Sequence, residues 1–182
     1  LPRLDGLDLH GTETLPLEPW TADLWRRARE AGKHTKAHAG EFMGPAFVRR
    51  VMDELGVSRI QHGVRAAESP ELLAEMRQRG TILDMCPISN LKLGVVPSME
   101  AHPIGVLLEA GVACTVSTDD PISFGNRLRD EYVALHTHCG LSLNQLGQLA
   151  ANGFRHALGD GVPFHRWISE IENLVEAYSP LD

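Results

Sequence analysis

Hydrophobic residues recur along this chain in two alternating patterns, one typical of helices and one of short strands. Apolar side chains at helical spacing, each run ending at a glycine, predict helices over about residues 21–32, 44–56, 69–80 and 102–111. Shorter apolar runs before and between them predict strands within 4–11, 33–40, 58–63, 81–87 and 112–121. Beyond Pro121 the pattern turns helical, with helices at about 142–157 and 163–178. Strands that alternate with helices over short connections predict an α/β fold with parallel strands.

Polar residues gather at one end of these predicted strands. His38, His62 and the pair Asp119 and Asp120 each fall at the carboxyl end of a strand, and Gly11 closes the first strand in the same way. In a (β/α)₈ barrel these ends open onto one face, where active sites are built. We therefore expect residues far apart in sequence to converge on that face.

The residue types in this set suit a zinc ion. Zinc accepts imidazole nitrogen and carboxylate oxygen, and a catalytic zinc keeps one position open for water, whose pKa it lowers to about 7. Glu41, three residues after His38, is placed to protonate a leaving or ring atom. A second histidine, His62, can take the proton of the water.

Each motif also has an ordinary interpretation when taken alone. A loop histidine usually lies on the surface, and "DDP" is most often a turn or a helix cap. The "HTH" run at 136–138 has the two-apart spacing of a metal pair, but it lies in a predicted helix, where such residues point to different faces. The run "SNLKLG" at 89–94 fits either a pocket lining or a polar surface turn. Only the coincidence of several motifs at the same end of successive strands favours a site.

The composition of the chain limits its expected partners and location, but it does not indicate a function. The net charge of −7 gives no footprint for nucleic acid, and no apolar run approaches the length that spans a bilayer, so we expect neither a nucleic-acid nor a membrane partner and a cytoplasmic location. Three cysteines with no CxxC spacing argue against a disulfide framework and a cysteine zinc module.

With these motifs in view, the sequence resembles the adenosine deaminase family of the amidohydrolase superfamily, which includes adenosine, adenine and AMP deaminases. The resemblance rests on motifs in the family's order and roughly its spacing: "HAGE" at 38–41, "QHG" at 61–63, "CPISN" at 86–90 and "STDDP" at 117–121. It extends over nearly the whole chain and implies a metal-dependent TIM barrel.

The resemblance implies a role for each matched residue. His38 and Asp119 would bind one Zn²⁺, Glu41 would donate a proton to purine N1, and His62 would orient and deprotonate the attacking water. Asp120 would contact purine N7, and the backbone N–H of Gly11 would face the purine ring. The implied reaction hydrolyses a 6-aminopurine to its 6-oxo product and ammonia.

The sequence departs from the family pattern in one respect. The family supplies two further zinc ligands as an HxH pair on the first barrel strand, which has no counterpart here. On this alignment residues 1–182 form a single domain holding strands four to eight and the terminal helices, with strands one to three missing. We expect the chain to be the carboxyl-terminal part of a longer deaminase, whose amino-terminal half lies in the same or another chain. The sequence does not indicate an oligomeric state.

Three functions compete at this point. The leading interpretation is a zinc-dependent deaminase of a purine nucleoside, because "DLHG" at 8–11 keeps the glycine-ended pattern of nucleoside deaminases; modified adenosines and free adenine remain alternatives. A second interpretation is a non-catalytic barrel remnant that binds a partner. A third is another amidohydrolase reaction, against which Glu41 argues, because protonating a ring nitrogen is a need of deaminases.

Overall fold

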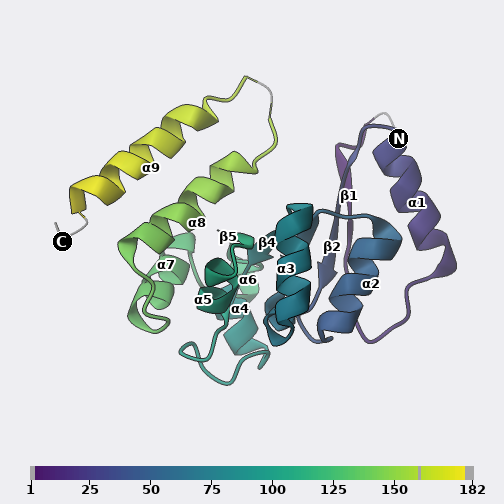
Figure 1. The fold of residues 1–182 in the computed structure, drawn as a ribbon, viewed down its shortest axis with the longest axis horizontal. Helices are drawn as coiled ribbons and strands as arrows, with labels where there is room; N and C mark the ends of the chain where they lie inside the picture. Colours follow the sequence, from purple (N-terminus) through teal and green to yellow (C-terminus); the bar gives the residue numbers. More distant parts are fainter. Residues whose placement is uncertain (1–2, 160, 179–182) are drawn as a thin grey trace. The chain divides into compact units, whose positions relative to one another are not determined.

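The computed structural model describes residues 3–159 and 161–178, which form two compact units (Figure 1). The first unit is the chain up to Met85 together with Glu109–Ala113, and the second is Cys86–Leu108 together with the chain from Cys114 onward. The predicted α/β class with parallel strands is confirmed. The single domain expected for residues 1–182 stays a prediction.

The first unit is a parallel sheet flanked by helices. Its elements are β1 (Gly6–Leu9), α1 (Pro19–Glu30), β2 (His34–Ala39), α2 (Pro45–Leu55), β3 (Arg59–His62), the 3₁₀ helix η1 (Val64–Glu68), α3 (Pro70–Arg79) and β4 (Ile82–Met85). The strands lie in the order β1-β2-β3-β4, and the register pairs Leu9 with Ala37 and Ala39 with His62. The carboxyl ends of β1, β2 and β3 therefore lie side by side.

Buried apolar side chains hold the helices of this unit against the sheet. Ala37, Ala39, Ile60 and Leu83 on the strands are fully buried, as are side chains of α1, α2 and α3, namely Ala28, Val48, Val51, Leu55, Leu72 and Met76. Burying such groups stabilises the unit by roughly 25 cal/mol per Å² of apolar surface. The core fixes where each strand ends, and so where each loop begins.

Helix ends follow the predicted signals in most cases. The Ser69 hydroxyl accepts the amide N–H of Leu72 at the start of α3, and Gly56 and Gly80 end α2 and α3 in the left-handed conformation. The first helix begins two residues before the predicted residue 21, because Pro19 occupies its first turn and Thr21 is buried inside it.

The second unit is mainly helical. It contains α4 (Pro87–Lys92), most of α5 (Ile104–Glu109) and β5 (Ala113–Val116), and then α6 (Pro121–Phe124), α7 (Leu128–Thr137), α8 (Leu143–Arg155) and α9 (Phe164–Tyr178). The predicted capping box of Ser142 and Gln145 opens α8, which lies beside α9 (Figure 1). No helix of the described ranges combines the length and apolar character needed to cross a membrane.

Candidate active site

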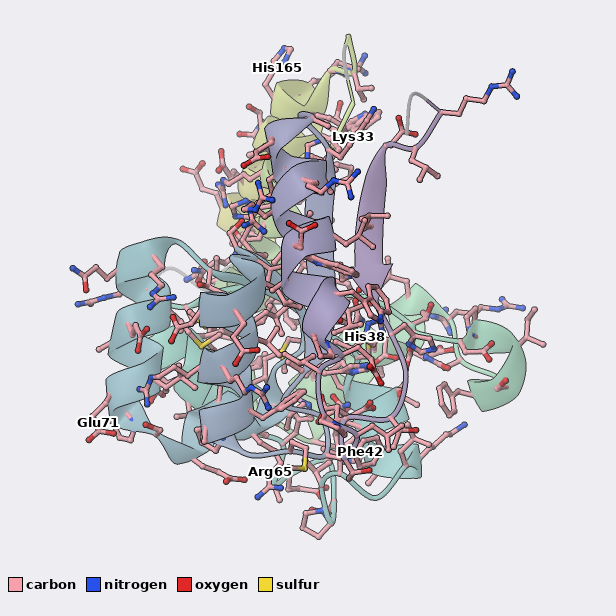
Figure 2. The ribbon with its side chains drawn as sticks, turned by 90° about the vertical axis from the view of Figure 1, so that its right-hand side faces the viewer. Lys33, His38, Phe42, Arg65, Glu71 and His165 are labelled. Atoms are coloured by element: carbon pink, nitrogen blue, oxygen red, sulfur yellow. The ribbon has the colours of Figure 1, made fainter. Side chains whose placement is uncertain are left out.

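His38 lies near the carboxyl end of β2 and below Lys33, the residue that precedes this strand, in the view of Figure 2. Its Nδ1 is 3.1 Å from the carbonyl oxygen of Leu9 and 3.2 Å from Oδ1 of Asp8, both on β1. Burial of the imidazole acts to lower its pKa, but the hydrogen bond and charge of Asp8 outweigh burial and the pKa of His38 is raised. Because both contacts use Nδ1, Nε2 is the nitrogen that remains to coordinate a metal.

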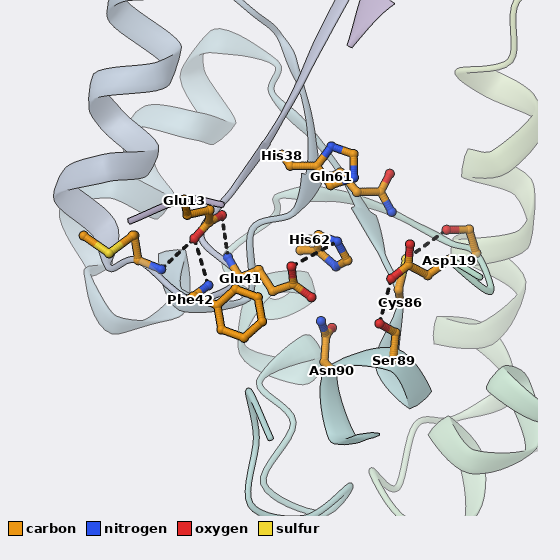
Figure 3. Close-up of polar contacts among 12 residues, drawn as sticks. Glu13, His38, Glu41, Phe42, Gln61, His62, Cys86, Ser89, Asn90 and Asp119 are labelled. Carbon is orange, nitrogen blue, oxygen red and sulfur yellow. Dashed lines mark hydrogen bonds and ion pairs between the residues drawn. The ribbon is translucent and has the colours of Figure 1, made fainter. Parts of the chain in front are cut away.

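The side chains of Glu41 and His62 face each other. Oε2 of Glu41 lies 3.6 Å from Nε2 of His62, and both side chains are largely buried, with 12% and 2% exposed (Figure 3). The rings of His38 and His62 are 5.4 Å apart between centroids. The first unit thus brings three of the predicted site side chains together.

Close backbone packing fixes the loops that carry these side chains. The amide of Gly63 donates to the carbonyl of Ala39, and the amide of Arg65 to the carbonyl of Gly40. A Cβ on Gly40 would lie 2.5 Å from Cγ2 of Val48, and one on Gly63 would lie 2.5 Å from Cδ2 of Leu83. A Cβ at either position would force its neighbour to shift, and both residues have positive φ, which favours glycine.

A buried carboxylate that the sequence reasoning missed fastens the loop after β2. Glu13, 7% exposed, accepts the backbone N–H groups of Glu41, Phe42 and Met43 at 3.0, 2.8 and 2.6 Å (Figure 3). Its neighbours in "GTET" look like an ordinary polar loop, so no local pattern signalled this role.

Gly11 lies in the segment after β1, next to the histidines. It lines a cavity of about 260 Å³ together with His10, Glu13, His38 and Phe47. The His10 and His38 rings pack edge to face, 4.6 Å apart. The predicted position of Gly11 at a strand end beside His38 is thus present in this unit, whereas its contact with a purine stays a prediction.

Asp119, in the second unit, follows β5 and is held by a serine. Oγ of Ser89 donates to its Oδ2 at 2.7 Å (Figure 3). Asp119 has φ 60°, and it shares a positive φ with His62, at φ 67°, alone among the non-glycine residues that the structure describes. Backbone strain of this kind gathers at functional sites. Both residues had been singled out from the sequence.

Asp120 uses its carboxylate as the N-cap of α6. It accepts the amides of Ile122 and Ser123, each at 3.1 Å, and the Ser123 hydroxyl. These hydrogen bonds, those of Ser123 above all, lower the pKa of Asp120, so the side chain is an ionised acceptor at neutral pH. The cap interpretation of "DDP" is confirmed for Asp120, without excluding a contact with a ligand.

Glu131 of α7 anchors the start of α4 in the same unit. Its Oε2 accepts the amide of Ile88 at 3.0 Å and its Oε1 accepts Nδ2 of Asn126 at 2.6 Å. Burial raises the pKa of Glu131 to about 7, against the lowering effect of these hydrogen bonds.

The two ambiguous motifs also lie in the second unit. His136 contacts the carbonyl of Leu141 and His138 contacts Glu100, so the predicted divergence of the "HTH" histidines is confirmed. The surface-turn interpretation of "SNLKLG" is wrong for Ser89 and Asn90, which are buried in α4, and is confirmed for Leu93 and Gly94, which form an exposed turn.

The donor atoms of each unit fit a zinc ion. His38 presents Nε2 while its Nδ1 is hydrogen-bonded, and Asp119 presents Oδ1 while its Oδ2 accepts from Ser89. Imidazole and carboxylate ligands oriented through their second polar atom are typical of zinc sites. Two protein ligands alone are fewer than a catalytic zinc requires.

Histidines, a glutamate and aspartates follow the parallel strands of this chain. This arrangement is typical of metal-dependent hydrolases with a barrel fold. Residues 3–173 match the profile of the adenosine deaminase family, so the chain belongs to that family. The resemblance inferred from the motifs is confirmed.

Individual relatives agree with this assignment. The chain is 36% identical over 181 residues to an adenine deaminase of Albidiferax ferrireducens, an alignment that covers 98% of this chain and 52% of that protein. The chain thus spans about half the length of the curated relatives it matches.

Solved structures give the same result for the fold. The crystal structure of an adenine deaminase from Arthrobacter aurescens superposes with a TM-score of 0.87 at 29% identity, over 94% of this chain and 53% of that one. An amidohydrolase from Burkholderia ambifaria with bound Zn gives 0.79 at 26%, over 93% and 50%. The neighbours are TIM barrels, and the chain has the fold of part of one, as the sequence predicted.

Proposed function

We propose that the protein containing this chain is a zinc-dependent deaminase of 6-aminopurines, with free adenine as the first candidate substrate. The observation that carries the proposal is the pairing of Glu41 with His62, an acid and a base 3.6 Å apart in a buried setting beside His38. A partner-binding remnant has no need of this arrangement, and amide or ester hydrolysis has no ring nitrogen for Glu41 to protonate.

His38 and Asp119 would hold the metal, together with ligands that this chain does not supply. The bound ion would make hydroxide available at neutral pH, as Zn²⁺ does with a coordinated water. The expectation that an HxH pair from an amino-terminal half completes the ligand set stays a prediction. Support for zinc comes from the donor set and from the zinc-bound amidohydrolase among the structural neighbours.

The residues of the chain itself would move the protons. His62 would take a proton from the attacking water through Nε2, which also faces Glu41. Glu41 would donate a proton to purine N1, so that the electron pair of the C6–N1 double bond can move to N1 as water adds to C6. The C6–amino bond would then break as the amino group takes the proton that His62 holds, and the C6 hydroxyl would return a proton to Glu41, leaving ammonia and the 6-oxo product. The backbone N–H of Gly11 would face the purine ring.

The relatives that this chain matches include several named adenine deaminases, which support free adenine as the substrate. Asp120 would contact the purine at N7.

A purine nucleoside is the second candidate. The glycine-ended "DLHG" pattern favours it at the level of sequence.

A comparison of substrates separates the two candidates. We would express the full reading frame with Zn²⁺ and compare kcat/KM for ammonia release from adenine, adenosine and a modified adenosine. We expect adenine to exceed adenosine by at least about 10²-fold, the scale on which unpaired polar groups discriminate substrates. A higher kcat/KM for adenosine would replace the base with the nucleoside, and no ammonia from any 6-aminopurine would refute the deaminase.

A further inference from the structure

Glu13 sits at the meeting point of the two loops that follow β1 and β2. It lies two residues beyond Gly11 and 28 residues before Glu41, and it is 7% exposed. Oε1 accepts the amide of Glu41, and Oε2 accepts the amides of Phe42 and Met43 (Figure 3). One carboxylate thus receives three successive backbone N–H groups.

These three donors are the hydrogen-bond partners that offset the charge of Glu13, and Arg65 adds a longer-range attraction. Within residues 3–159 and 161–178, no basic side chain comes within ion-pair distance of it. A run of backbone amides that converges on an anion forms a concave binding site, and hydrogen bonds to a charged acceptor are stronger than neutral ones. An amide in place of the carboxylate would turn an NH₂ group toward at least one of these N–H donors.

Arg65 also forms hydrogen bonds with the loop that follows β2. Nη1 of Arg65 donates to the carbonyl oxygen of Phe42 at 2.6 Å, and its backbone N–H bonds the carbonyl of Gly40. Figure 2 shows Phe42 and Arg65 together at the same end of the unit. Three donor groups of the loop therefore meet an anion and one acceptor, the Phe42 carbonyl, meets a cation, so the backbone of Glu41 has little freedom to shift.

We infer that Glu13 is a positioning residue for Glu41, and this inference rests on the proposed deaminase function. Glu13 acts through the backbone of the loop: by fixing the amides of residues 41–43, it places the Glu41 carboxyl group opposite His62 and joins it to the segment of Gly11. A displacement of about 1 Å in a reacting group costs up to about 10²-fold in rate. Loss of the Glu13 clamp should therefore lower kcat more than it raises KM.

The test compares Glu13→Gln with wild type in the full-length, zinc-loaded protein. We expect kcat for ammonia release to fall by about 10-fold or more, KM to change less than about twofold, and zinc content to stay the same. Backbone amide exchange at residues 41–43 should accelerate by at least about 10-fold, because these amides lose their charged acceptor. Glu30→Gln is the matched control, because it removes the same charge from an exposed side chain of α1 that pairs with Arg26.

A double-mutant cycle separates positioning from general loosening. On a Glu41→Ala background, Glu13→Gln should change the residual rate by less than about twofold, because the group it positions is already gone. An equal loss on both backgrounds, or unchanged amide exchange, would overturn the inference. Accelerated exchange with an unchanged kcat in an active enzyme would also overturn it. A wild-type enzyme without deaminase activity would instead refute the proposed function, while the exchange data would still test the clamp.

Discussion

Two buried glutamates each hold a neighbouring backbone segment in place, and they accept hydrogen bonds from different kinds of donor. Glu13 in the first unit accepts three successive loop amides, whereas Glu131 in the second accepts one backbone amide, of Ile88, and one side-chain amide, of Asn126. Burial raises the pKa of Glu131 to about 7. The first unit uses its glutamate to hold the backbone of Glu41, and the second uses a group that titrates near neutral pH to hold α4.

The predicted site residues differ between the units in a similar way. In the first unit, side chains from neighbouring strand ends meet directly, as Glu41 and His62 do. In the second, each aspartate is engaged locally: Asp119 accepts from Ser89, and Asp120 caps α6. The proposed proton-transfer residues therefore contact each other in the first unit, whereas the carboxylates of the second unit are oriented by their own neighbours.

The largest expected effect concerns the acid in the first unit. Glu41→Ala should lower kcat/KM for ammonia release by on the order of 10²-fold or more, because the proposed proton donor to the purine ring is lost. Zinc content should not change. The measurement is steady-state ammonia release by the full-length enzyme beside a Glu54→Gln control on the exposed face of α2. Activity close to wild type would remove the acid from the mechanism.

The free energy of unfolding should depend on pH through the titration of Glu131 in the second unit. The pKa of Glu131 is raised from 4.5 to about 7 on folding, so the folded state binds the proton more tightly between these values. The free energy of unfolding should therefore fall as pH rises through this window, by on the order of 3 kcal/mol for this group.

Glu131→Gln isolates that contribution. Denaturant unfolding of the full-length protein at pH 5, 6, 7 and 8 would give the stability difference between wild type and variant. This difference should shift in favour of the variant as pH rises. A difference independent of pH would show that Glu131 does not titrate in this range.

The close packing of loops in the first unit gives a smaller effect with a matched control. Gly40→Ala places a Cβ 2.5 Å from Cγ2 of Val48 at φ 74°, whereas Gly80→Ala meets nothing within 4 Å at φ 66°. Both lose the freedom of glycine at positive φ, at about 1 kcal/mol, and only Gly40→Ala adds overpacking, at about 1–3 kcal/mol. Equal unfolding free energies for the two variants would contradict the packing described for Gly40.

The smallest effect concerns the orientation of Asp119 in the second unit. Ser89→Ala removes the hydrogen bond to Oδ2 and should weaken zinc binding by about 10-fold, the lower end of what removal of such supporting groups costs. Competition with a metal chelator would measure it. Ser123→Ala beside Asp120 serves as the control and should leave zinc affinity unchanged.

The sequence predicted those features that arise from local pattern. The strand and helix alternation, the glycine stops of α2 and α3, and the places of His38 and His62 at strand ends all followed from periodicity and turn chemistry. The family could be recognised from the sequence because the polar residues of each motif are close neighbours in short, contiguous runs.

The sequence did not reveal contacts made across long separations. Glu13 meets residues 28 to 30 positions away, and Ser89 meets Asp119 across 30 positions, so neither pair leaves a local signature. The burial of Ser89 and Asn90 depends on tertiary packing as well, which is why "SNLKLG" looked equally suited to a surface turn.

The most direct test of the central claim is the fate of the oxygen of water. Zinc-loaded full-length protein would be incubated with adenine in heavy-oxygen water, and the product identified by mass. Hydrolytic deamination predicts the 6-oxopurine with the heavy oxygen at C6 and one ammonia released for each product formed. Unchanged adenine, or a product without the label, would contradict the account.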